Sequence, residues 1–300
     1  MATHPTVKTI LVATDFSEDA GAALDWAAAV ARESGAKIIL THAAMVTTPV
    51  APEFVPLDGS FYTQLYDIAR SRLEELAVKV REDGLTVETE LSVEPAVSSV
   101  LSVAQKRGAD VIVAGTRGLT GWKRVVLGSV AARIVREARC PVVTVHAADA
   151  KKHRPVRTIL IATDFSEDAA LAASAASRLV GEGGPDRRLV LLHVYHYPVI
   201  FTQSAPPVLA AKIEEVIHSA RREIAALAAR FERQGVHVET RIDEGTPARV
   251  ILDHAEQLGA DLIAMGTHGR SGLDRLFLGS TASKVLSAAP CPVLTVRSPV

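Results

Sequence analysis

"TILVATDFSEDA", from Thr9 to Ala20, is repeated almost unchanged as "TILIATDFSEDA", from Thr158 to Ala169. Each copy begins with a short apolar run that lacks the polar alternation of a half-exposed strand. Such a run is typical of a central parallel strand that is covered on both faces. A serine and two acidic residues follow, which is the composition of a helix start. The stretch therefore predicts a buried strand that turns directly into a helix, once in each half of the chain.

Two further stretches repeat in the same order along the chain. "GADVIVAGTRG" (108–118) returns as "GADLIAMGTHG" (259–269), and "CPVVTV" (140–145) returns as "CPVLTV" (291–296). Repeats of whole segments in one order indicate a duplicated unit. The chain of 300 residues is therefore interpreted as two copies of one domain.

The boundary between the copies falls in "AADAKKHRP" (147–155), a polar stretch that ends in proline. We predict a first domain over residues 1–148, a linker over 149–154 and a second domain over 155–300. Each half then has the size of an ordinary domain. The second copy also carries an insertion, "GEGGPDRR" (181–188), at a place where a surface loop tolerates extra residues.

Strand and helix patterns alternate within each half. The strands expected in the first half cover 9–13, 37–43, 86–92, 110–115 and 141–146. Those expected in the second half cover about 157–162, 189–195, 236–242, 261–266 and 292–297. Strands that alternate with helices imply a parallel sheet with right-handed crossovers. The predicted fold is α/β: two tandem doubly wound domains, each a five-stranded parallel sheet with helices on both faces.

Composition argues against several classes of protein. The formal net charge is −1, whereas a general nucleic-acid binder needs a basic face. No apolar run approaches the roughly 18 residues that span a bilayer, and the N-terminus lacks the pattern of a signal peptide. The two cysteines are too few for a disulfide framework or a zinc site, so buried free thiols are expected. We therefore expect a cytoplasmic protein that binds neither nucleic acid nor membrane.

A glycine pattern follows the fourth strand of each half. Gly115 and Gly118 end that strand, and Gly128 and Ser129 open the next helix. In such sheets, ligands bind beyond the carboxyl ends of the strands, where the strand order reverses. Glycine allows close backbone approach and positive φ, and a helix N-terminus favours phosphate. The pattern predicts a phosphate cradle, although the glycines could instead form turns and the serine could instead cap the helix.

An aspartate follows the first strand of each half, Asp15 and Asp164. Such a carboxylate could accept a hydrogen bond from an adenine amino group or a ribose hydroxyl. The alternative role is helix capping, but Ser17 and Ser166 stand at better cap positions.

Histidine and arginine occupy other candidate positions. Arg117 and His268 match each other within the glycine loops, where either could lie near phosphates. His42 and His193 end the second strands, and there a structural role is favoured over a ligand role. No Walker A lysine, paired carboxylates or positioned general base can be picked out, so no catalytic and no metal-ligating residue is predicted.

These segments resemble the universal stress protein family in its tandem two-domain form. The family's nucleotide motif G-2x-G-9x-G-[ST] is matched twice, first by Gly115, Gly118, Gly128 and Ser129 and then by Gly266, Gly269, Gly279 and Ser280. The resemblance implies the strand order 3-2-1-4-5 in each domain. It also implies ATP as the ligand, with Mg²⁺ held mainly by the nucleotide phosphates.

The resemblance and the glycine loops together give the candidate cofactor-binding residues. In the first domain they are Ala13, Thr14, Asp15, Ala43, Gly115, Arg117, Gly118, Gly128, Ser129, Val130 and Ala131. In the second domain they are Ala162, Thr163, Asp164, Val194, Met265, Gly266, His268, Gly269, Gly279, Ser280, Thr281 and Ala282. The base would lie near the aspartate and the end of the second strand, and the phosphates over the glycine motif.

The two halves differ at the turn before the third helix. Glu94 stands in the first half where Gly245 stands in the second. A carboxylate at that mouth could weaken nucleotide binding in the first domain, so the second domain is the stronger candidate for ATP.

The resemblance also implies how the domains associate and act. Segments 141–146 and 292–297 would pair antiparallel as an intramolecular pseudo-dimer, and a homodimer through other surfaces is open. The leading function is an ATP-binding, nucleotide-dependent stress-response module with adenine nucleotide as its partner. The alternatives are a slow ATPase or autokinase and a scaffold in which the glycines form turns only, so enzymatic activity is undecided.

Overall fold

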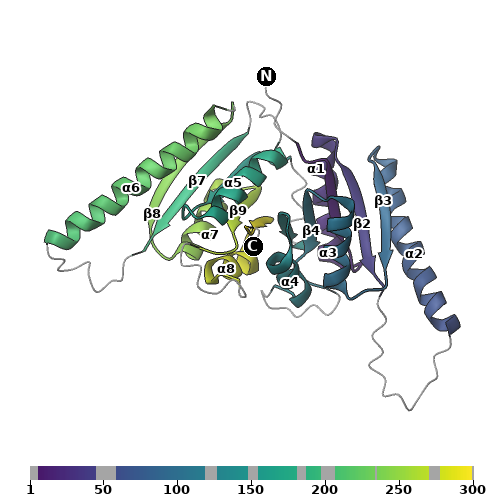
Figure 1. Ribbon diagram of the computed structural model, residues 1–300. Helices are drawn as coiled ribbons and strands as arrows, with labels where there is room; N and C mark the ends of the chain where they lie inside the picture. The colour runs from purple at the N-terminus through teal and green to yellow at the C-terminus, as the bar shows by residue number, and fades with distance from the viewer. Residues whose placement is uncertain are drawn as a thin grey trace, which may run out of the picture. The chain divides into compact units, whose positions relative to one another are not determined.

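A computed structural model describes residues 6–44, 59–118, 127–147, 155–180, 187–196, 207–233, 235–269 and 278–298. The chain divides into two compact units, one comprising Val7–His153 and the other comprising Arg154–Val300 together with the N-terminal residues up to Thr6 (Figure 1). The predicted linker at 149–154 and most of the insertion at 181–188 lie outside the described residues.

The first unit is built on a parallel sheet. Its strands are β1 (Thr9–Ala13), β2 (Lys37–Ala43), β3 (Val87–Ser92), β4 (Val111–Gly115) and β5 (Val142–Val145). They lie in the order β3-β2-β1-β4-β5, and the pairs between neighbours are parallel. This confirms the doubly wound sheet expected for the first half.

Helices cover both faces of this sheet. They are α1 (Glu18–Ser34), α2 (Gly59–Glu82), α3 (Ala96–Arg107) and α4 (Ser129–Glu137). An ion pair joins Arg32 of α1 to Asp83 just after α2, while α3 packs against α4. Right-handed crossovers put α1 and α2 on one face and α3 and α4 on the other, because the chain reverses its direction of travel after β3.

The second unit repeats this plan. Its strands are β6 (Thr158–Ala162), β7 (Arg188–Tyr195), β8 (His237–Glu244), β9 (Leu262–Gly266) and β10 (Val293–Val296). Its helices are α5 (Glu167–Val180), α6 (Pro207–Glu232), α7 (Pro247–Leu258) and α8 (Ser280–Ala288). The strands lie in the order β8-β7-β6-β9-β10 and pair in parallel, which again is the order 3-2-1-4-5.

The opening stretch folds as its composition predicts. Ile10, Leu11 and Val12 of β1 have no exposed surface, as expected for a strand with helices on both faces. Ser17 is the N-cap of α1, and its side chain accepts a hydrogen bond of 3.2 Å from the amide of Ala20. Gly35 ends the helix in the left-handed region at φ 70°. One buried apolar strand and one capped helix therefore form the centre of each domain.

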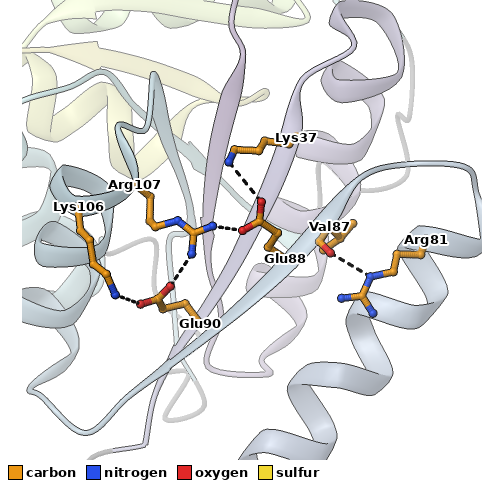
Figure 2. A network of polar contacts seen from close by, with 7 residues as sticks. All are labelled: Lys37, Arg81, Val87, Glu88, Glu90, Lys106 and Arg107. Atoms are coloured by element: carbon orange, nitrogen blue, oxygen red, sulfur yellow. Dashed lines mark hydrogen bonds and ion pairs between the residues drawn. The ribbon is translucent and has the colours of Figure 1, made fainter.

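A charged network covers the outer part of the first sheet, where β3 is the terminal strand. Figure 2 shows the guanidinium of Arg107 between Glu88 and Glu90, with Lys37 on Glu88 and Lys106 on Glu90. The Nη1 of Arg107 lies 2.8 Å from the Oε2 of Glu90. Surface ion pairs contribute only about 0–1 kcal/mol each, but charges on a terminal strand oppose pairing with other chains. This network therefore protects an edge more than it stabilises the fold.

The two cysteines are free thiols. Cys291 is buried and Cys140 is half-buried. Burial raises the pKa of the Cys140 thiol to about 11, so little reactive thiolate forms at neutral pH. This agrees with a structural role and not a redox role for Cys140.

Among the residues that the structure describes, no helix has the length and apolar character that a membrane span requires.

Candidate functional site

Each unit has a cavity where its strand order reverses. In the first unit a cavity of about 400 Å³ opens beyond the carboxyl ends of β1 and β4. In the second unit a cavity of about 280 Å³ opens at the equivalent ends of β6 and β9. Every candidate residue predicted for a domain lines the cavity of that domain. The fold thus brings together segments that lie about one hundred residues apart in the sequence.

The turn from β1 to α1 forms one side of the first cavity. The amide of Phe16 donates to Thr14 Oγ1, and the amide of Ser17 donates to Asp15 Oδ1, both at 3.0 Å. Phe16 lies at φ 65°, a left-handed conformation that is uncommon outside glycine. These two bonds hold the turn, and they direct the other carboxylate oxygen of Asp15 toward Gly118. Phe165 has φ 63°, and Thr163 and Asp164 accept the same bonds in the second unit.

His42 and His193 have structural contacts. The Nδ1 of His42 lies 2.8 Å from the carbonyl oxygen of Thr14, and the ring lies 4.5 Å from that of Phe16. A carbonyl oxygen only accepts, so Nδ1 is the donor. His193 makes the same bond to Thr163 at 2.8 Å. The histidines therefore fix the turn that carries the aspartate, which supports the structural role favoured from the sequence.

The glycine loop of the first unit is anchored by Asp19, a residue that the sequence did not single out as part of the site. Its carboxylate accepts hydrogen bonds from Thr116 Oγ1 at 2.8 Å, from the amide of Arg117 at 3.0 Å and from the amide of Ala147 at 2.9 Å. The Nε of Arg117 adds a charged bond of 3.1 Å. The side chain of Asp19 is only 5% exposed. The loop is thereby tied to the first turn of α1 and to the segment after β5.

The ionisation of Asp19 follows from these contacts. Burial alone raises the pKa of the carboxyl, but the bonds from Arg117, Thr116 and Ala147 outweigh burial and leave the pKa below its ordinary value. Asp19 is therefore a carboxylate at neutral pH.

Asp168 has the same role in the second unit. It accepts from Thr267 Oγ1 at 3.1 Å, from the amide of His268 at 3.2 Å and from the amide of Ser298 at 2.8 Å. Burial raises its pKa, yet these hydrogen bonds, led by those from Ser298, bring it below the ordinary value. The available sequence signal was that the aspartate and the threonine are identical in both copies.

Close packing against backbone atoms requires glycine at the first and third positions of the motif. A Cβ on Gly115 would lie 2.7 Å from the carbonyl carbon of Asp19, and one on Gly128 would lie 2.9 Å from the carbonyl oxygen of Thr116. Gly118 differs, because its Cβ would meet only the side-chain oxygen of Asp15, at 2.7 Å. None of the six motif glycines has a positive φ, so close approach of neighbouring atoms, and not left-handed backbone, accounts for glycine at these positions.

This contrast gives a prediction. Gly115→Ala should lower the free energy of unfolding by roughly 1–3 kcal/mol, because the new methyl group meets helix backbone that cannot move aside alone. Gly118→Ala should cost clearly less, because the carboxylate of Asp15 can rotate. Urea denaturation of both variants measures the difference. Equal losses would show that the backbone of α1 yields easily at Gly115.

The N-terminus of α4 opens onto the same cavity. The N-cap of α4 is Gly128, and Ser129 is the first helical residue. Because glycine has no side chain, no side-chain hydrogen bond caps this helix. The first bond into the helix runs from the amide of Ala132 to the carbonyl of Gly128. The amides of the first turn precede it, and such groups have no partner within a helix. The site therefore offers backbone donors and a hydroxyl, which together suit an anion.

Arg117 and Glu94 were expected to influence phosphate binding in the first unit, and the structure shows what each of them contacts or faces. Arg117 lines the first cavity, but its guanidinium is bound to the carboxylate of Asp19. Glu94 is exposed and is not among the described residues that line the cavity. Gly245 has φ 151°, so the turn of the second unit has a backbone that favours glycine. The sequence difference at this turn therefore reflects backbone conformation and places no carboxylate on the wall of the first cavity.

Within the part of the chain that the structure describes, no three histidine, cysteine, aspartate or glutamate side chains are grouped so as to hold a metal ion.

Comparisons with known proteins agree with this architecture. The family model described as the universal stress protein family matches residues 6–146 and again residues 155–297. A universal stress protein of Mycolicibacterium smegmatis is 33% identical over 298 residues, with 96% of each chain covered. A universal stress protein of Mycobacterium tuberculosis is 27% identical over 305 residues, again with 96% of each chain covered.

Solved structures share the fold. The structure of a universal stress protein from Archaeoglobus fulgidus has a TM-score of 0.67 at 22% identity, with 97% of this chain and 98% of that chain covered. A universal stress protein structure from Pseudomonas aeruginosa has a TM-score of 0.65 at 22% identity, with 98% and 94% covered.

Proposed function

Because the chain belongs to the universal stress protein family, we propose that it binds ATP in both of its cavities and acts as a nucleotide-dependent module of a cytoplasmic stress response. The observation that carries this proposal is the convergence, in each unit, of the glycine loop, a helix N-terminus and a strand-end aspartate on one cavity. Each of the three offers a feature that a nucleotide requires.

The phosphate end is supported by the geometry of the glycine loop and α4. Ser129, Val130 and Ala131 of the first helical turn line the cavity together with Gly118 and Gly128, and Ser129 is exposed. Hydrogen-bond donors at the positive end of a helix dipole stabilise phosphate oxygens. Ser280, Gly269 and Gly279 offer the same arrangement in the second unit. Mg²⁺ would be held mainly by the phosphates.

The base end is supported by the apolar part of each cavity. Ala13, Ala43 and Ala131 line the first cavity beside Asp15. An apolar cleft with one well-placed carboxylate suits a base or a ribose, because carboxylate oxygens accept from amino and hydroxyl groups. The proposal places the adenosine moiety there.

We also propose that the two domains of one chain associate through their last strands. The terminal strand segments 141–146 and 292–297 are apolar and would pair antiparallel within one molecule as a pseudo-dimer. A homodimer would then use other surfaces. Support for this part comes from the composition of the segments and from the tendency of unpaired apolar edges to seek a partner.

Isothermal titration calorimetry with ATP and Mg²⁺ tests the proposal. We expect saturable binding with two sites per chain, and a rise in melting temperature with ATP concentration. No heat and no thermal shift at millimolar ATP would overturn it. Phosphate release measured on the same samples separates binding from the slow ATPase alternative.

A further inference from the structure

The two cavities share one plan but differ in size, about 400 Å³ in the first unit against about 280 Å³ in the second. Many lining positions are identical, including the glycines and the aspartate. Several apolar lining positions nevertheless differ between the two units.

Residues of three neighbouring strands form the floor of each cavity. In the first unit Ala13 pairs with Thr41 on one side and with Ala114 on the other, and all three line the cavity. In the second unit Ala162 of β6 pairs with Leu192 of β7. On the other side of β6, Ile161 pairs with Ala264 of β9, and Met265 is the next residue of that strand. Leu192 and Met265 both line the second cavity, and Met265 is 5% exposed. Larger apolar side chains therefore fill the second floor.

The helical wall changes in the same direction. Ala96 and Val100 of α3 line the first cavity, and Pro247 and Ile251 of α7 line the second. The end of the second strand also differs, because Ala43 lines the first cavity and the larger Val194 lines the second.

Val194 takes the place of Ala43 in the second unit, on the part of the wall assigned to the base. One exchange runs the other way, since Ile134 lines the first cavity, whereas its smaller counterpart Val285 is not among the described residues of the second wall. Most of these exchanges put a larger apolar residue beside the second cavity, in keeping with its smaller volume.

We propose that the two sites differ in specificity. The first admits an adenine nucleotide that carries an apolar substituent on its base, and the second admits only the unsubstituted nucleotide. This inference rests on the proposed function. A well-packed apolar wall resists added volume, and one surplus or missing methylene typically changes discrimination by about 10–200-fold. The residues that set the difference are Ala114 and Thr41 against Met265 and Leu192.

Calorimetry with ATP and three analogues tests the inference. The analogues carry one apolar substituent each, at C2, at N6 or at C8 of adenine, so the test does not depend on which edge of the base faces the floor. We expect two sites for ATP and one site for at least one analogue, with affinity at the second site at least about tenfold weaker than at the first. If every analogue fills both sites or neither, the inference is wrong while the proposed function stands. If ATP itself does not bind, the proposed function fails as well.

Variants assign the sites. Ala114→Met should remove the analogue from the first site. Thr41→Leu narrows the same floor independently and should have the same effect, so the result does not depend on the folding of one variant. Met265→Ala should raise the number of analogue-binding sites per chain from one to two. A single cooperative melting transition like that of the wild type is the control for folding in each case. An unchanged number of analogue sites per chain in the folded variants would overturn the assignment.

Discussion

Asp19→Asn is expected to lower the free energy of unfolding of the first unit by about 2–3 kcal/mol, because hydrogen bonds to a charged group contribute ~1.5–3 kcal/mol. The carboxylate accepts from Thr116, Arg117 and Ala147, and asparagine keeps one acceptor oxygen but presents an amide group to the remaining donors. The guanidinium of Arg117 is 36% exposed and can regain water, which holds the expected loss below that of a fully buried ion pair.

The chain allows this loss to be measured in one unit. Its two tryptophans, Trp26 and Trp122, both fall within Val7–His153. Urea denaturation followed by tryptophan fluorescence therefore reports on the first unit. Glu18→Gln is the matched control, since it removes one acidic residue from the same helical turn at an exposed position. If Asp19→Asn and Glu18→Gln shift the transition equally, the anchoring role of Asp19 is refuted.

The pH dependence provides a second measurement on the same variant. The folded-state pKa of Asp19 lies below its ordinary value, so its contribution to stability is complete above the unfolded pKa of about 4 and is lost as pH falls through the folded pKa. The difference between wild type and Asp19→Asn should therefore shrink below about pH 4. A difference that stays constant from pH 7 to acid would mean that the carboxylate charge is irrelevant.

Much of the fold could be predicted because the signals are local. The apolar run of β1, the serine cap and the αL glycine at position 35 act within a few residues of themselves. The role of Asp19 could not be predicted in this way. In sequence it looks like an acidic residue that favours a helix start, and its threonine partner lies 97 residues away. Only the parallel pairing of β1 with β4 brings the two together.

The site shows the same division. The spacing of the motif glycines predicts that they lie at the site. It does not predict why each position requires glycine. Position 115 requires glycine because the backbone of α1 lies against it, and Gly115 does not have a positive φ. The difference in cavity size was also hidden, because Thr41 and Ala114 become neighbours of Ala13 only through strand register.

Ser129→Glu and Ser280→Glu are expected to weaken ATP binding in their own units by at least about tenfold, equivalent to about 1.4 kcal/mol. Both serines are exposed first residues of helices that line the cavities. A carboxylate there would lie where the proposed site holds phosphates, and like charges repel strongly at short range. Calorimetry should show one ATP site in each single variant and none at micromolar ATP in the double variant.

This test separates loss of binding from loss of folding. A carboxylate in the first turn of a helix interacts favourably with the dipole, by about 0.3–1 kcal/mol, so the melting temperature should not fall. Ser129→Gln is the matched control, because glutamine has the size of glutamate without its charge. If glutamine weakens ATP as much as glutamate does, the effect is steric and the helix N-terminus is not the phosphate site. If neither variant changes ATP binding, the phosphates lie elsewhere. Only a loss confined to glutamate, reduced at high salt as exposed charges are screened, would show that the phosphates rest on the first turn of each helix.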